Sequence, residues 1–352
     1  MKIKTIEFCA SIFIMMQCCL MGFFFSGTYK YMGANGWIIP IIGTFIGFPI
    51  LLLYLYIFNK KEDINKIINN YFGKFGKFIN ILLILFISFF ASILFWNVTE
   101  FTHLQYLYNT PLSFISIILI LCIIYILNNG TNSLFRTLLM ITYILLILHI
   151  INSISLVSQV NLNNIKPLFY GKFNILKPLL DYIVYTICPI FCLLIIPKNK
   201  IEDKNLNKNI IITYFISCLT TTIILFLIIS VCGINIIDLF QYPEFHILKR
   251  VSFLGISQRL EKILAIYWFL VGISGVILFS NYVFHSLKTN FNTNKINYLY
   301  IIIILFCSQY FFPNIIVARN FINYIFTYLI PIFLIIIPLI LCIKIKKSSK
   351  TT

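Results

Sequence analysis

The chain has 352 residues, of which 60% are hydrophobic and only 11% are charged. Soluble domains carry charge at roughly 25% of their positions, so this composition excludes a soluble globule, and its hydrophobicity excludes a disordered chain. The net charge of +17 would suit a nucleic-acid-binding protein, but the lysines and arginines lie in short segments between long apolar runs, where they act as orientation signals. We therefore predict an all-α integral membrane protein that contacts membrane lipids and no nucleic acid.

Ten apolar runs are long enough to span a membrane, because one spanning helix needs about 20 apolar residues. We expect the spans at Ile6–Ser26, Gly36–Phe58, Phe78–Tyr108, Leu112–Leu127, Leu134–Val157, Pro178–Pro197, Ile210–Val231, Ser257–Leu287, Tyr298–Val317 and Phe321–Ile343. The third and eighth runs exceed the thickness of the hydrocarbon core, so these helices are expected to tilt or to project beyond it. The spans form two halves of five, residues 1–158 and 178–352, joined by an external loop over residues 159–177.

The connecting segments predict the orientation of the chain. Loops on the side of the two termini carry twice as many lysines and arginines as loops on the other side, and such an excess marks the cytoplasmic side. Both termini, including the basic tail after Ile343, are therefore expected in the cytoplasm. In the first cytoplasmic loop, Asn59–Lys77, apolar residues recur at helical spacing opposite lysines, which predicts an amphipathic helix on the membrane surface.

Helix-breaking residues lie inside the two spans that open the two halves. The first span contains Gly22 and Gly27, and the sixth contains Pro189 beside Cys188. Interrupted helices at corresponding positions are typical of transporter binding sites, because the freed backbone groups must either meet a ligand or be buried in protein. Glycine and proline are also common in membrane helices that bind nothing. The residues alone leave both interpretations open.

Polar side chains inside the spans are further candidates for ligand contacts. An intramembrane carboxylate is a functional candidate, which singles out Glu100, although a glutamate paired outside the bilayer is the alternative. Asp181 lies near a span end, where we expect it to be solvated, and His149 is expected to be a packed histidine rather than a proton relay. The predicted ligand site comprises Gln17, Gly22, Ser26, Gly27, Trp96, Asn97, Glu100, Cys188, Pro189, Tyr267 and Ser274.

The sequence carries no signature of catalysis. It contains no GxSxG, HExxH, P-loop or GxGxxG motif. Its ten cysteines include no CxxC pair and lie apart from any cluster of histidines or carboxylates, so we expect neither a metal site nor a cofactor. A membrane enzyme is therefore disfavoured.

One stretch of the sequence indicates a particular protein family, which the composition alone does not. The run from Gln241 to Ser252 (QYPEFHILKRVS), followed by QRLE at Gln258–Glu261 and by Trp268, resembles the spore germination permease family. These proteins are the B subunits of nutrient germinant receptors, within the amino acid–polyamine–organocation transporter superfamily. The family has an arginine shortly before the glutamate of its third span. This chain has Asn97 and Val98 at that place, which argues against an ion pair there.

The resemblance implies an architecture of two inverted five-helix repeats, residues 1–158 and 178–352, with a ligand site between broken first and sixth helices. It implies a subunit that senses a small nutrient, often an amino acid, together with a larger membrane A subunit and a lipoprotein C subunit. It places the protein in the cell membrane or the spore inner membrane. Structural or partner contacts are expected at Tyr242, Pro243, Arg250, Arg259, Glu261 and Trp268.

A secondary amino acid transporter driven by H⁺ or Na⁺ is the alternative function. A proton-driven carrier needs a buried titratable group on its path, and in the sequence only Glu100 qualifies well. We therefore favour the sensor.

Overall fold

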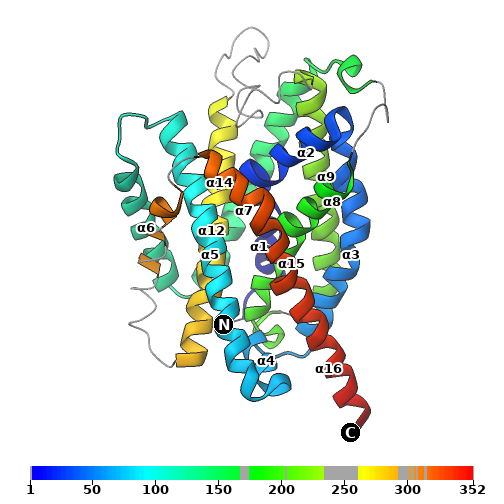
Figure 1. The fold of residues 1–352 in the computed structure, drawn as a ribbon, viewed down its shortest axis with the longest axis vertical. Coiled ribbons are helices and arrows are strands. Elements are labelled where there is room, and N and C mark those ends of the chain that lie inside the picture. Colours follow the sequence, from blue (N-terminus) through cyan, green and yellow to red (C-terminus); the bar gives the residue numbers. More distant parts are fainter. Residues whose placement is uncertain are drawn as a thin grey trace.

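The computed structural model describes residues 2–166, 174–202, 204–233, 261–291, 301–302, 305–306, 308–312 and 315–351. Among these residues the secondary structure is helical, apart from an isolated β-bridge between Ile3 and Ile201. Seven of the described helices are long and apolar enough to cross a membrane, and two shorter apolar helices accompany them. The helices gather side by side in one bundle (Figure 1). The predicted all-α membrane class is confirmed.

The helices follow the chain in an order close to the expected one. Up to Val157 the chain forms α1 (Thr5–Gln17), a π-helical segment (Leu20–Phe24), α2 (Phe25–Met32), a 3-10 segment (Gly33–Ile38), α3 (Ile39–Phe58), α4 (Ile64–Phe72), α5 (Lys74–Gln105), α6 (Leu112–Asn128) and α7 (Thr131–Val157). After α7 it forms 3-10 segments (Leu162–Ile165 and Lys198–Lys200), α8 (Leu176–Tyr182), a π-helical segment (Ile183–Ile187), a 3-10 segment (Cys188–Ile195), α9 (Leu206–Cys232), α12 (Glu261–Phe291), α14 (Ile315–Phe321), α15 (Thr327–Pro331) and α16 (Ile337–Thr351), with π-helical segments at Ile322–Phe326 and Ile332–Ile336.

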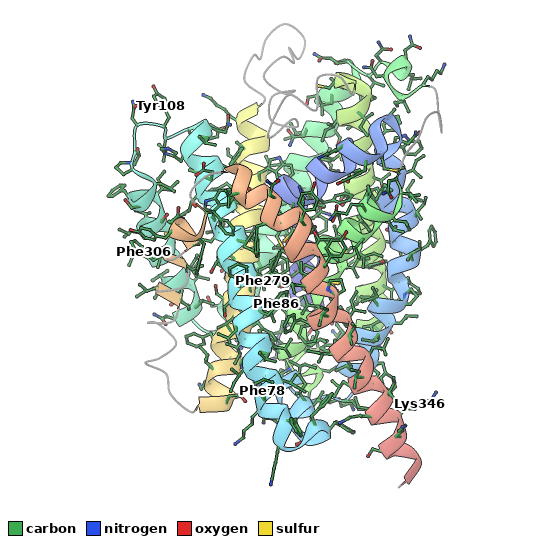
Figure 2. The ribbon with its side chains drawn as sticks, viewed as in Figure 1. Phe78, Phe86, Tyr108, Phe279, Phe306 and Lys346 are labelled. Atoms are coloured by element: carbon green, nitrogen blue, oxygen red, sulfur yellow. The ribbon has the colours of Figure 1, made fainter. Side chains whose placement is uncertain are left out.

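Large apolar side chains cover both the inside and the outside of the bundle. Inside, Phe86 of α5 stacks on Phe333 with ring centroids 4.4 Å apart, and Figure 2 shows side chains filling the space between the helices. Outside, Phe45 on α3, Leu121 on α6 and Met140 on α7 are each more than 60% exposed. An apolar outer surface on helices of spanning length is what a lipid environment requires.

The amphipathic helix expected in the first loop is α4. The Asp63 carboxylate caps it by accepting a hydrogen bond from the Asn65 N–H at 2.8 Å, a common way to satisfy a free amide at a helix start. Ile64 and Ile68 lie on the buried face of this helix. Gly73, at φ +58°, ends α4 and starts α5, because glycine adopts positive φ without strain.

Both termini lie at the end of the bundle that holds α4. The backbone of Ile3 pairs with that of Lys200 and Glu202, between the sixth span and α9. Near the other terminus, the Lys344 ammonium donates to the Tyr71 carbonyl of α4 at 3.3 Å. Common placement of the termini requires an even number of crossings, as the ten expected spans provide.

The last helix differs from its expected bounds. We expected a ninth span to end at Val317 and a tenth to cover Phe321–Ile343, but a helical stretch begins at Ile315 and continues to Thr351. Pro331 does not end it: π-helical turns follow at Ile332–Ile336, and the helix continues beyond them. The lysines beyond Ile343 remain helical, where their positive charges favour a helix C-terminus.

Candidate functional site

The first spanning helix is broken at its centre. α1 ends at Gln17, Cys19 leaves the helical region at φ −106° and ψ 14°, and a π-helical segment follows from Leu20. The expected break at Gly22–Gly27 was therefore placed too late, since Gly22 lies inside the π-helical segment and Gly27 inside α2. The large side chains that follow Cys19, not the glycines alone, accompany the change in winding: Phe23, Phe24 and Phe25 are fully buried.

The sixth spanning helix is broken at Pro189, as the sequence predicts. α8 gives way to π-helical turns at Ile183–Ile187 and then to a 3-10 segment that begins at Cys188–Pro189. Proline has no N–H to donate, and its ring pushes away the carbonyl four residues earlier, here that of Tyr185. The expected pair of broken first and sixth helices is confirmed.

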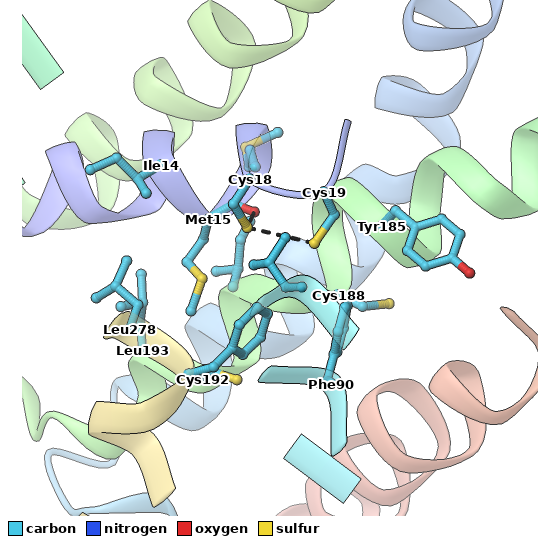
Figure 3. Close-up of a cluster of buried hydrophobic side chains, with 14 of the residues drawn as sticks. Ile14, Met15, Cys18, Cys19, Phe90, Tyr185, Cys188, Cys192, Leu193 and Leu278 are labelled. Carbon is cyan, nitrogen blue, oxygen red and sulfur yellow. Dashed lines mark hydrogen bonds between the residues drawn. The ribbon is translucent and has the colours of Figure 1, made fainter. Parts of the chain in front are cut away.

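The two broken helices meet through aromatic rings. The Phe23 ring lies 5.4 Å from that of Tyr185, and the Phe24 ring lies 5.4 Å edge-on from that of Tyr182. Figure 3 shows the side chains of four cysteines near Tyr185, those of Cys18, Cys19, Cys188 and Cys192. All four are buried. The crossing therefore combines irregular backbone with small, weakly polar side chains.

Helices α5 and α12 close the crossing from the side. A Cβ atom added at Gly275 of α12 would stand 2.5 Å from the Cβ of Cys18 and 2.9 Å from Cδ2 of Leu94 on α5. Small residues at such contacts let membrane helices approach closely. Two turns nearer the start of α12, the Trp268 ring lies 5.7 Å edge-on from the Phe25 ring of α2. The site is thus bounded by the two broken helices, α5 and α12.

The predicted ligand residues do not all face this crossing. Gln17 turns toward α9, where its amide donates to the Ser217 carbonyl at 2.9 Å and to the Thr220 hydroxyl at 3.0 Å. Trp96 packs on Phe312, with ring centroids 5.4 Å apart. Glu100 is half-buried near the end of α5.

The remaining predicted residues are spread over the described helices. Cys188, Pro189 and Ser274 are buried, as are Asn97, Tyr267 and Trp268. Ser26 lies in α2, and Glu261 is the first residue of α12. Tyr242, Pro243, Arg250 and Arg259 lie outside the described residues.

Buried polar groups without partners occur between α7 and α12. Among the described residues, both ring nitrogens of His149, the side-chain amide of Asn152 and the indole N–H of Trp268 make no hydrogen bond. The His149 ring lies 6.4 Å from that of Tyr267. Such groups are normally satisfied by water or a ligand. The region therefore adds polar lining next to α2, in which Asn152 is the residue that the sequence did not single out.

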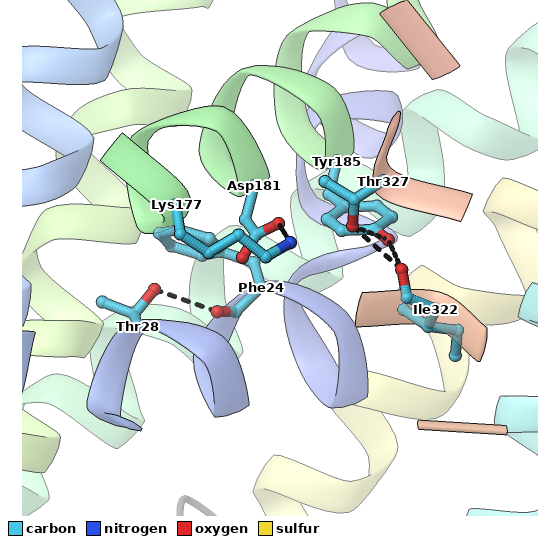
Figure 4. Close-up of polar contacts among 7 residues, drawn as sticks. All are labelled: Phe24, Thr28, Lys177, Asp181, Tyr185, Ile322 and Thr327. Carbon is cyan, nitrogen blue, oxygen red and sulfur yellow. Dashed lines mark hydrogen bonds and ion pairs between the residues drawn. The ribbon is translucent and has the colours of Figure 1, made fainter. Parts of the chain in front are cut away.

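Asp181 contradicts its expected solvation. Its carboxyl group is buried and forms an ion pair with the Lys177 ammonium, with 2.7 Å between Nζ and Oδ1. The Lys177 ammonium also lies 5.3 Å from the ring centroid of Tyr328 on α15. The i, i+4 spacing was visible in the sequence, but the burial follows from the helices around α8, among which α2 and α3 pack directly against it. Figure 4 shows the ion pair.

A membrane bundle with two broken helices crossing at its centre has the architecture of transporter-type permeases. The chain belongs to the family described as spore germination protein, whose family model matches residues 2–316. This confirms the resemblance drawn from residues 241–268. None of the curated protein sequences compared with the chain matches it.

Solved structures of transporters share the fold. The Eremococcus coleocola manganese transporter, in complex with an aromatic bis-isothiourea substituted compound, has 14% identity and a TM-score of 0.65, covering 95% of this chain and 78% of its own. A Na⁺-coupled sialic acid symporter has 12% identity and a TM-score of 0.59, covering 92% and 73%. The nucleobase-cation-symport-1 family transporter MHP1 has 13% identity and a TM-score of 0.64, covering 91% and 74%. Identities this low show the fold alone.

Proposed function

We propose that the protein is the nutrient-sensing membrane subunit of a spore germinant receptor. It binds a small ligand, an amino acid, where the segments Cys18–Phe24 and Ile183–Ile195 cross, and it signals through partner subunits. The observation that carries the proposal is the family match over residues 2–316 in a chain whose two broken helices meet.

The crossing has the chemistry to hold an amino acid. A break in a helix frees amide N–H groups, which favour a carboxylate, and carbonyl groups, which favour an ammonium. Gly22, Gly27 and Pro189 lie in or next to the irregular segments. Tyr267 and Ser274 of α12 supply buried side chains of the predicted site, and Ser26 lies in α2.

Coupled transport is the second candidate function. A carrier driven by H⁺ or Na⁺ needs ionisable groups within its spans, and Asp181 and His149 are both buried there. Counterflow of labelled amino acids in liposomes separates the two functions. Binding without counterflow supports the sensor, and counterflow that depends on an H⁺ or Na⁺ gradient supports the transporter.

Assembly and orientation complete the proposal. The described chain is almost entirely helix of the bundle, so an output signal must leave through other subunits, the A and C subunits of the receptor in the spore inner membrane. Contact surfaces are proposed at residues 59–77 and 233–262. The lysine bias supports cytoplasmic termini. Reporters fused at Lys166 and at Asn205 should then report opposite sides, with Lys166 external, and equal signals would contradict this topology.

A further inference from the structure

The ion pair between Lys177 and Asp181 uses one oxygen of a buried carboxylate and leaves the other, Oδ2, without a hydrogen bond among the described residues. The Lys177 and Asp181 side chains are 10% and 1% exposed, respectively. Oδ1 of Asp181 accepts a hydrogen bond from the Lys177 ammonium at 2.7 Å. Oδ2 has no donor in hydrogen-bonding geometry among the described residues, and the Thr327 hydroxyl is the polar group that neighbours the carboxyl group. An acceptor buried in this way normally binds a ligand or water.

The pair stands next to the crossing of the broken helices. Asp181 immediately precedes Tyr182, which contacts Phe24, and lies one turn before Tyr185, which contacts Phe23. Figure 4 shows Lys177 and Asp181 beside Phe24 on one side and the contacts of Tyr185 on the other. From the crossing, the pair lies toward the start of α8, away from the end of the bundle that holds the termini.

The neighbouring contacts hold α8 against the last helices. The Tyr185 hydroxyl donates to the Ile322 carbonyl at 3.0 Å and lies 2.8 Å from the Thr327 hydroxyl. Tyr328 follows Thr327 in the chain, and the Lys177 ammonium lies over its ring. The ion pair is therefore enclosed by protein and does not lie on an open surface.

Stability alone gives little reason to keep such a pair. Taking two charges out of water costs about as much as their attraction returns, and apolar residues of similar size are often as stable or more so. Removing only one partner is strongly destabilising, because the other charge stays buried and unpaired. A partner that brings both charges at once avoids that penalty.

We infer that Lys177 and Asp181 form an exchangeable recognition pair for the zwitterion of a free amino acid. The ligand ammonium binds Asp181, beginning at the free Oδ2, and the ligand carboxylate binds Lys177. Every buried charge stays paired during the exchange. This inference rests on the proposed function, because it names the charge pattern of the ligand that the crossing binds.

Ligand analogues with one charge are the direct test in the wild-type protein. The protein in lipid nanodiscs is screened against the common L-amino acids by intrinsic tryptophan fluorescence, and the amino acid that binds is compared with its α-amide and its N-acetyl derivative. The amide leaves Lys177 unpaired and the N-acetyl compound leaves Asp181 unpaired. Each is expected to bind roughly tenfold more weakly or worse.

A paired substitution tests the residues themselves. The double variant Lys177→Met with Asp181→Leu removes both charges, so its thermal unfolding midpoint should stay close to that of the wild type, while binding of the amino acid weakens roughly tenfold or more. The matched control is Lys30→Met, which removes an exposed lysine of α2 and should bind as the wild type does.

The outcomes separate this inference from the proposed function. If the double variant binds the amino acid as the wild type does, or if the amino acid and both analogues bind equally, the pair is structural and the inference is overturned, while nutrient sensing stands. If the wild type binds no amino acid, both fall. The analogue comparison needs no variant and decides the question even if the double variant does not fold.

Discussion

Gly275 of α12 and Cys18 of the first helix approach so closely that a Cβ atom on the glycine would stand 2.5 Å from the Cβ of Cys18. The contact joins α12 to the point where the first helix breaks. Neither atom is the flexible end of a long side chain, so only a shift of the backbone would make room.

Gly275→Ala should therefore destabilise the protein. Overpacking of a tight contact typically costs about 1–3 kcal/mol, and a lower thermal unfolding midpoint in detergent would report it. Gly36→Ala is the control, because its Cβ would meet the ends of two side chains at longer distances, Cγ2 of Thr28 at 3.0 Å and Cδ1 of Ile229 at 3.3 Å, and a smaller decrease is expected. Equal midpoints for both variants and the wild type would show that α12 does not press on the break.

The stability of the α4 region should depend on pH through Asp63. Burial raises the pKa of the Asp63 carboxyl from 3.8 to about 6. Between these values the folded protein keeps a proton that the unfolded chain has released, so stability falls as the pH rises from 3.8 through about 6 and stays lower above it.

Asp63→Asn should remove this dependence. Asparagine still accepts the hydrogen bond of the Asn65 N–H but carries no buried charge, so the variant should be more stable than the wild type above the raised pKa, by on the order of 2 kcal/mol. Thermal unfolding midpoints over the same pH range measure the effect. Glu62→Gln, at an exposed neighbour, is the control. Parallel curves for the wild type and Asp63→Asn would refute the assignment.

Glu100 tests whether a carboxylate of α5 takes part in ligand response. An unpaired charge at the bilayer centre costs about 2.5–3.5 kcal/mol on insertion scales; Glu100 instead lies half-buried near the end of α5. If it faces the ligand path, Glu100→Gln should leave the protein level unchanged and shift the ligand concentration for half-maximal response about threefold or more. If Glu100→Gln responds to the ligand as the wild type does over a range of pH, the carboxylate takes no part in the response.

The sequence predicted those structural features that depend on neighbouring residues in the chain, and it missed those that depend on packing between distant segments. A proline changes its own helix wherever it stands, so the break at Pro189 was predictable, and the alternation of apolar residues and lysines sufficed for α4. The break at Cys18–Cys19 was missed because no residue there is a strong helix breaker. It accompanies the packing of Phe23 and Phe24 against the sixth span, which only the folded chain contains.

The candidate site was harder to predict than the fold because it depends on the rotation of each helix. Gln17 lies one residue before the break, yet its side chain turns to α9. Asp181 stands near a span end, where solvation is the usual outcome, yet the neighbouring helices bury it. Composition and spacing carry no information about which neighbour a given helix face will meet.

The reactivity of the thiols at the crossing tests the proposed ligand site most directly. In a variant that retains only Cys18, Cys19, Cys188 and Cys192, a small membrane-permeant maleimide is expected to label Cys19 or Cys188, and a saturating concentration of a binding amino acid should slow that labelling. The site is contradicted if none of the four thiols reacts, or if every labelling rate stays the same with the amino acid bound.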